Sequence, residues 1–95
     1  MRNLIVSSGV LAKLRDKHEV TVREVEQCFE NKIGLYLEDP RPDHQTDPAT
    51  LWFIAPTNRE RLLKVSFMFI DGNIHLKSAY NPEEEAIAIY DLLGK

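Results

Sequence analysis

Residues 61–80 constrain the fold of this chain more than any other segment. They read RLLKVSFMFI, then Asp71-Gly72, then NIHLKSAY: two runs of alternating character separated by the dipeptide preferred in two-residue hairpin turns. Such a turn fixes the register of the two strands, so it pairs residue 70 with 73, 68 with 75, 66 with 77 and 64 with 79. We therefore predict an antiparallel hairpin with strands over 61–70 and 73–80.

The predicted register gives the hairpin two different faces. One face is apolar and is expected to pack in a core: Leu63, Val65, Phe67, Phe69, Ile74 and Leu76. The other face is polar and carries Lys64, Ser66, Met68, His75 and Lys77. An apolar core does not accept unpaired charges, but the sequence does not show whether the first helices or the C-terminal helix cover this polar face.

Patterns elsewhere predict the elements around the hairpin. A short strand is expected over 2–7, a helix over 8–17, and a second helix after Thr21-Val22-Arg23-Glu24, which has the form of a capping box. Strands are expected over 35–37 and 51–55, and the all-apolar second run predicts cover on both faces. Asn81-Pro82 predicts a C-terminal helix capped by Asn81. Its expected buried stripe is Ala86, Ile89, Tyr90 and Leu93.

Length and composition fit a single domain over residues 1–95. The chain is 28% charged with a net charge of −3, and it lacks an apolar run long enough to span a bilayer, so we expect a cytoplasmic protein without membrane contact. The single cysteine, Cys28, excludes an internal disulfide, and no Cys or His spacing predicts a metal or cofactor. The predicted class is α+β, an antiparallel sheet of four to five strands with two N-terminal helices and one C-terminal helix.

Candidate functional residues gather on the polar face of the hairpin. They are two lysines that are diagonal neighbours in the predicted register, a histidine one pair away and two arginines of the preceding turn: Lys64, Lys77, His75, Arg59 and Arg61. A cationic cluster of this kind can hold a phosphate. The alternative interpretation is a solvated face whose lysines protect a sheet edge from unwanted pairing.

Other candidates each have a structural interpretation beside the functional one. Lys17-His18 ends the first predicted helix, where the helix dipole favours cations. His44 lies in a loop with three aspartates, but the spacing fits no standard metal site. Trp52 is expected in the core rather than as a base-stacking platform, and Tyr80 ends the hairpin either as a packing residue or as a hydroxyl facing a site.

Several short motifs occur in a characteristic order: DKHEVTVREVEQCFEN, the Asp43-His44 loop, the strand with Trp52, RLLKVSF, and LKSAY followed by an acidic helix with Tyr90. This order resembles the BrnT family of type II toxins, which share the RelE-like ribonuclease fold. Where the family has a glycine after Lys-His, this chain has Glu19. Where the family ends a strand with S-A-R, this chain has Ser78-Ala79-Tyr80.

The resemblance implies a bacterial toxin of a toxin–antitoxin pair, a metal-independent endoribonuclease that binds RNA and is covered by a cognate antitoxin. Phosphate contact and proton transfer would then fall to Lys64, Lys77, His75 and Tyr80. Further RNA contacts would come from Arg59, Arg61, Lys17, His18 and His44.

Two alternatives stay open at this point. The first is a non-catalytic binding module that uses the same sheet face for a protein or a nucleic acid. The second is an ADP-ribosyl-dinitrogen-reductase hydrolase, a label carried by similar short proteins, which would require a divalent metal. The sequence does not fix the RNA target or the oligomeric state.

Overall fold

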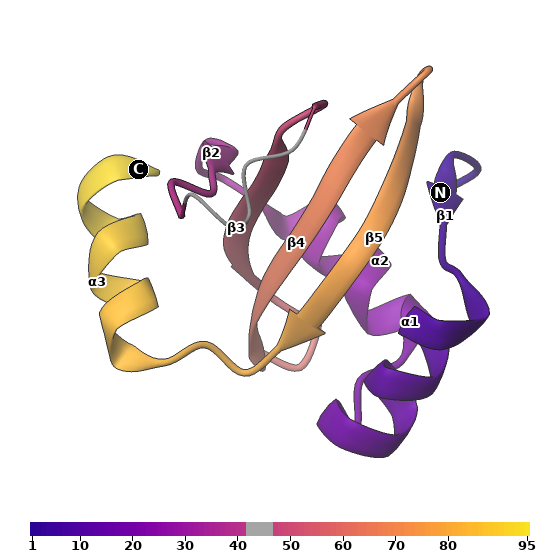
Figure 1. Ribbon diagram of the computed structural model, residues 1–95. Helices are drawn as coiled ribbons and strands as arrows, with labels where there is room; N and C mark the ends of the chain where they lie inside the picture. Colours follow the sequence, from indigo (N-terminus) through magenta and orange to yellow (C-terminus); the bar gives the residue numbers. More distant parts are fainter. Residues whose placement is uncertain (42–46) are drawn as a thin grey trace.

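The computed structural model describes residues 1–41 and 47–95, which form an α+β fold (Figure 1). In chain order the elements are β1 (Leu4–Ile5), α1 (Ser8–Lys13), a π-helical turn η1 (Leu14–His18), α2 (Val22–Asn31), β2 (Leu37–Glu38), β3 (Thr50–Pro56), β4 (Leu62–Ile70), β5 (Asn73–Tyr80) and α3 (Glu84–Leu93). The strands form one sheet in the order β1-β5-β4-β3-β2. Because β1 runs parallel to β5 while the other neighbours are antiparallel, the sheet is mixed rather than antiparallel throughout.

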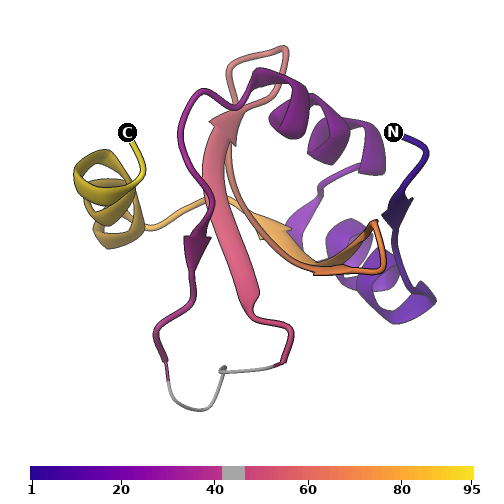
Figure 2. The ribbon, with the colours of Figure 1, turned by 90° about the horizontal axis from the view of Figure 1, so that it is seen from above.

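Helices lie on both faces of the sheet. Seen from above in Figure 2, α1 and α2 are on one side of the sheet and α3 is on the other. α2 contacts β3 and β4, α1 and η1 contact β5, and α3 contacts β3. β3 is therefore covered on both faces, as its all-apolar sequence predicted. No helix in the described ranges is long and apolar enough to cross a membrane.

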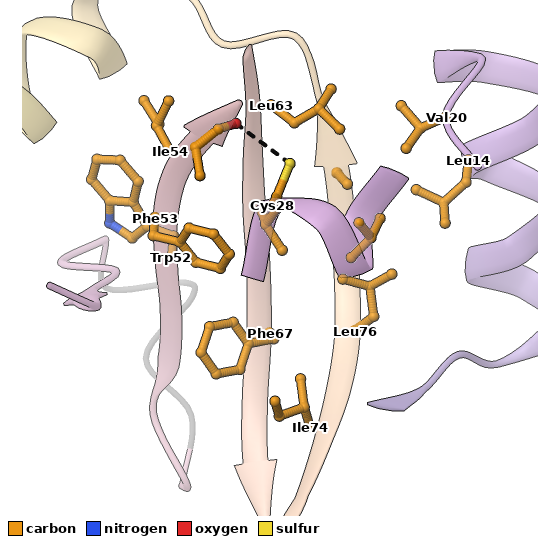
Figure 3. Close-up of a cluster of buried hydrophobic side chains, with 14 of the residues drawn as sticks. Leu14, Val20, Cys28, Trp52, Phe53, Ile54, Leu63, Phe67, Ile74 and Leu76 are labelled. Atoms are coloured by element: carbon orange, nitrogen blue, oxygen red, sulfur yellow. Dashed lines mark hydrogen bonds between the residues drawn. The ribbon is translucent and has the colours of Figure 1, made fainter. Parts of the chain in front are cut away.

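The core lies between α2 and the sheet. Phe29 of α2 meets Phe53 of β3 edge-on, with ring centroids 4.8 Å apart, and Phe67 of β4 packs beside them. Figure 3 shows Phe53 and Phe67 on the same side of the strands as Cys28, whereas Trp52 lies on the other side of β3. Of the predicted apolar face, only Phe69 is wrong: it is 52% exposed because the tip of the hairpin extends past the helices (Figure 1).

Two local predictions are confirmed by the backbone. The Thr21 hydroxyl oxygen accepts a hydrogen bond from the Glu24 N–H (3.1 Å), and the Glu24 carboxylate accepts one from the Thr21 N–H (3.0 Å), which completes the capping box. Asp71 and Gly72 both have positive φ, 51° and 81°, as a type I′ turn requires. These short-range signals therefore determine the start of α2 and the β4–β5 turn.

The predicted register of the hairpin holds near the turn and fails beyond it. Ile70 pairs with Asn73 and Met68 with His75, as expected, but the pairing then skips Lys77. Ser66 consequently pairs with Ser78, and Lys64 with Tyr80. The predicted pairs 66–77 and 64–79 are wrong because a β-bulge adds one residue to β5.

The first predicted helix and one predicted strand differ in their bounds. The helix expected over 8–17 divides into α1 and the wider turn η1, which closes at Glu19 with a left-handed φ of 53°. The strand expected over 35–37 begins pairing only at Leu37, because the Leu35 N–H donates instead to the Gly94 carbonyl at the end of α3 (2.6 Å).

The C-terminal helix begins later than predicted and buries less. Its N-cap is Glu83, because the Asn81 side chain accepts a hydrogen bond from Arg61 Nε (3.0 Å) instead of capping α3. Tyr90 is buried and donates its hydroxyl hydrogen to the Leu35 carbonyl (2.8 Å). The rest of the predicted stripe is only partly buried, with Ile89 40% and Leu93 59% exposed.

Candidate functional site

The sheet face opposite α2 carries polar side chains that are half-buried or exposed. In the view of Figure 1, no helix of the described chain lies in front of β4 and β5, while α3 covers the same face at β3 (Figure 2). The side chains on this open face are Lys64, Ser66, Met68, His75, Lys77, Ser78 and Tyr80. The sequence left open whether a helix covers this face, and no described helix does so at β4 and β5.

At the end of the hairpin far from its turn, four side chains form a row that we call the Lys64 cluster. Lys64 lies opposite Tyr80 across the β4–β5 pair. Its Nζ is 4.7 Å from the ring centroid of Trp52 and 6.0 Å from that of Tyr80, so the ammonium group lies over two aromatic rings. His18, at the end of η1, stacks on Tyr80 with ring centroids 5.3 Å apart.

Arg61 positions His18 in this cluster. Its Nη2 donates to the His18 carbonyl (3.0 Å), and its Nη1 donates to the Glu19 carbonyl (2.8 Å) and to a Glu24 carboxylate oxygen (3.3 Å). With the Asn81 contact, one guanidinium joins η1, α2 and the segment before α3. Arg61 was predicted to follow an RNA backbone, but its donors are directed to acceptors within the protein.

The carboxyl group of Glu24 responds to this environment. Burial raises the pKa of Glu24, but the hydrogen bond from the Thr21 N–H and the positive charge of Arg61 outweigh burial. The net result is a pKa below the ordinary glutamate value, so Glu24 is ionised at neutral pH and the ion pair with Arg61 is intact.

Lys77 and His75 lie nearer the hairpin turn than the Lys64 cluster does. Lys77 Nζ donates to the hydroxyl of Thr50 on β3 (3.3 Å), and His75 pairs with Met68. Lys77 precedes Tyr80 by three positions, which is about 10 Å along a strand at roughly 3.3 Å per residue. The bulge thus separates Lys77 from Lys64, which the sequence had predicted as diagonal neighbours.

The remaining predicted site residues are peripheral or lie outside the described chain. Arg59 is exposed on the turn between β3 and β4, and Lys17 is exposed in the last turn of η1, next to His18. His44 lies outside the described residues. The structure therefore gathers His18, Lys64 and Tyr80 from the predicted set and leaves the others away from this cluster.

A cleft of about 540 Å³ adjoins the Lys64 cluster between β2, β3 and α3. Trp52 and Lys64 lie in its wall, and Trp52 also contacts Tyr90 of α3 with ring centroids 5.7 Å apart. The sequence predicted Trp52 as a core residue, and its 7% exposure confirms that. Its contact with Lys64 was missed because the polar turn between β3 and β4 does not reveal their register.

Cys28 is excluded as a nucleophile by its surroundings. It is buried under the sheet, and its thiol donates to the Ala55 carbonyl at a distance of 3.4 Å (Figure 3). Burial, and next the negative charge of Glu24, raise the pKa of the thiol to about 12. In residues 1–41 and 47–95, no group of three His, Cys, Asp or Glu side chains is placed to hold a metal ion.

No family model, no curated protein and no solved structure matches this chain. What the protein does must therefore be inferred from the chemistry of its side chains, of which the Lys64 cluster offers the most.

Proposed function

We propose that the protein is a cytoplasmic toxin that cleaves RNA without a metal, at the Lys64 cluster, and that a cognate antitoxin is its partner. The observation that carries this proposal is the convergence of an ammonium, a phenol and an imidazole on an open sheet face: Lys64, Tyr80 and His18. RNA cleavage needs a cation for the phosphate and two groups that exchange protons. The cluster supplies the cation, Lys64, and two groups that can exchange protons, Tyr80 and His18.

In the proposed reaction, the RNA 2′-hydroxyl attacks the adjacent phosphorus, and the bond from phosphorus to the 5′-oxygen breaks. In this reaction His18 accepts the proton of the 2′-hydroxyl, Tyr80 donates a proton to the departing 5′-oxygen, and Lys64 stabilises the charge on the phosphoryl oxygens. The products are a 2′,3′-cyclic phosphate and a free 5′-hydroxyl.

Position 19 supports the resemblance to the BrnT family. The family has a glycine after Lys-His, and Glu19 has a φ of 53°, in the left-handed region that glycine adopts without steric cost. The chain thus keeps the backbone conformation that the family's glycine would favour, although its residue differs. The second departure, Tyr80 in place of an arginine, falls inside the Lys64 cluster.

The test uses purified protein and a single-stranded RNA oligonucleotide, with EDTA present. Wild type should release a 2′,3′-cyclic phosphate and should leave a 2′-deoxy oligonucleotide intact. We expect His18→Ala to lower the cleavage rate by roughly 100-fold or more and Lys64→Ala to lower it similarly, because each removes a group acting on the transition state. Lys13→Ala, an exposed lysine on α1, is the matched control and should cleave as wild type does.

Two results would contradict the assignment. Cleavage that survives the His18→Ala/Lys64→Ala double substitution places the chemistry elsewhere. Loss of cleavage in His75→Ala or Lys77→Ala, with His18→Ala unaffected, returns the site to the turn end of the hairpin. In cells, induced wild type should arrest growth and degrade RNA, and the double variant should do neither.

The second candidate function is a module that binds RNA through this face without cleaving it. It is favoured by the small number of cations free to hold a phosphate, since Arg61 is engaged within the protein and Lys77 contacts Thr50. Binding of the same oligonucleotide, lost in Lys64→Ala and accompanied by no product in wild type, would establish this second function.

A further inference from the structure

Helix α3 leaves part of its apolar surface uncovered. Tyr90 is buried against Trp52, but Ile89 and Leu93, one turn apart on the same side of the helix, are 40% and 59% exposed. Both line the cleft between α3 and β2, together with Ala86 and Trp52. The sequence encodes a core-facing stripe here, and residues 1–41 and 47–95 leave Ile89 and Leu93 of that stripe exposed.

Carboxylates surround this apolar cleft. Glu83 and Glu85 stand at the start of α3, and Glu38 stands on β2 across the cleft. All three are exposed, and none of them forms an ion pair with any residue in 1–41 or 47–95. Two cations also line the cleft: Arg41 pairs with Asp39 (2.7 Å), and Lys64 lies over the Trp52 ring in the cleft wall, so the carboxylates outnumber the cations.

We propose that this cleft docks an amphipathic helix of a partner protein whose apolar residues are flanked by lysine or arginine. Ile89 and Leu93 form an i, i+4 ridge of the kind that packs into the groove of another helix. The rim carboxylates then pair with the basic residues on either side of the partner's apolar stripe. The proposal concerns protein recognition, goes beyond the RNA chemistry proposed above, and stands if no RNA is cleaved.

The charges of the rim argue against two other occupants. RNA would bring phosphates toward Glu38, Glu83 and Glu85, and like charges repel. A second copy of this chain would bring its own identical carboxylates to the same place, in a protein whose net charge is already −3. A helix with an apolar stripe flanked by basic residues can pack on the ridge of Ile89 and Leu93 and pair with the carboxylates of the rim.

The chain carries its own reporter for a binding test, because Trp52 is its only tryptophan and lies in the cleft wall. The probe is a synthetic Leu/Lys amphipathic helix of about four turns without aromatic residues, and the control probe has glutamate in place of each lysine. We expect the Leu/Lys peptide to change the Trp52 emission saturably at low salt, with weaker binding at high salt. The Leu/Glu peptide should not bind.

Matched variants of the protein locate the binding. Ile89→Asp/Leu93→Asp should weaken binding about tenfold or more, and Glu83→Lys/Glu85→Lys should do the same. The controls lie on the same helix but outside the cleft lining: Leu92→Asp, at an 81% exposed position, and Glu84→Lys. Both controls should bind within about twofold of wild type.

Three outcomes would overturn the proposal. Absence of saturable Leu/Lys binding removes the partner helix as the occupant. The single variants Glu83→Lys, Glu85→Lys and Glu84→Lys change the net charge equally. If all three weaken binding equally, the peptide is attracted by the overall charge rather than by the cleft. A doubled mass in sedimentation equilibrium that returns to monomer in Ile89→Asp/Leu93→Asp identifies a second copy as the occupant. RNA cleavage enters none of these measurements, so their failure and that of the proposed function are separable.

Discussion

The two faces of the sheet differ in how completely they are covered, although the same strands build both. On the α2 face, the odd-numbered residues of β4 up to Phe67 are sealed: Leu63, Val65 and Phe67 are at most 2% exposed. On the opposite face, Lys64, Ser66 and Met68 of β4 are only half-buried, because α3 packs mainly on β3. The residues that seal the core and those of the candidate site thus alternate along one strand, so the two sets can be substituted separately.

The strongest test of this comparison substitutes neighbours in β4 that face opposite ways. Phe67→Ala should lower the free energy of unfolding by about 3–5 kcal/mol, because it leaves a cavity among packed aromatic rings. Met68→Ala, on the open face, should lower it by about 1 kcal/mol or less. Urea unfolding followed by far-UV circular dichroism measures both. Similar losses at the two positions would mean that the open face also contributes to the core.

Arg61 connects η1, α2 and the segment before α3 through its hydrogen bonds, and its substitution should have the next largest effect. Arg61→Ala leaves two η1-terminal carbonyls and the Glu24 carboxylate without their donor, so we expect a loss of about 2–3 kcal/mol. Arg59→Ala removes an exposed arginine from the same turn and should change stability by less than about 0.5 kcal/mol. Equal small effects would show that η1 holds its position without this clamp.

Much of the fold could be predicted because the signals for it are local. The capping box of α2 and the Asp71-Gly72 turn each depend on a few adjacent residues, and both are confirmed. The all-apolar sequence of β3 predicted its two-sided cover, and the alternation in β4 predicted which residues are sealed, except for Phe69.

What the sequence could not predict depends on contacts between distant residues. The skip at Lys77 follows from how β5 must fit β4 over its whole length, which the two-residue turn does not encode. Asn81 has the form of an N-cap, yet Arg61, twenty residues earlier, uses its side-chain oxygen. The Lys64 cluster depends on both effects, so Lys64, Tyr80 and His18 could be named as candidates from the sequence, but neither their arrangement nor the contact of Lys64 with Trp52 could be predicted.

Glu19, which ends η1, offers a test with a smaller expected change in the free energy of unfolding. Its left-handed backbone is costly for a residue with a Cβ and free of that cost for glycine, so Glu19→Gly should raise the free energy of unfolding by about 1 kcal/mol. Lys17→Gly lies two residues earlier, inside η1, and should instead destabilise the protein by about 1 kcal/mol. If both substitutions destabilise equally, position 19 is not strained and the support that it gives to the family resemblance is lost.

The smallest effect expected is a pH dependence that belongs to the charge of Glu24. Its pKa is lowered in the folded protein, so ionised Glu24 adds stability at pH values above the unfolded pKa of about 4.3, and that contribution disappears as the pH falls through the folded value. Glu24→Gln keeps an acceptor for the capping box but removes the charge that Arg61 contacts. Wild type should therefore be more stable than Glu24→Gln by about 1 kcal/mol or less at pH 7, and the difference should shrink below pH 4.3 and vanish once the pH is below the folded pKa. A difference that is constant from pH 7 to the acid range would assign the effect to packing rather than to charge, and Arg61 would then hold the open-face histidine through its carbonyl contacts alone.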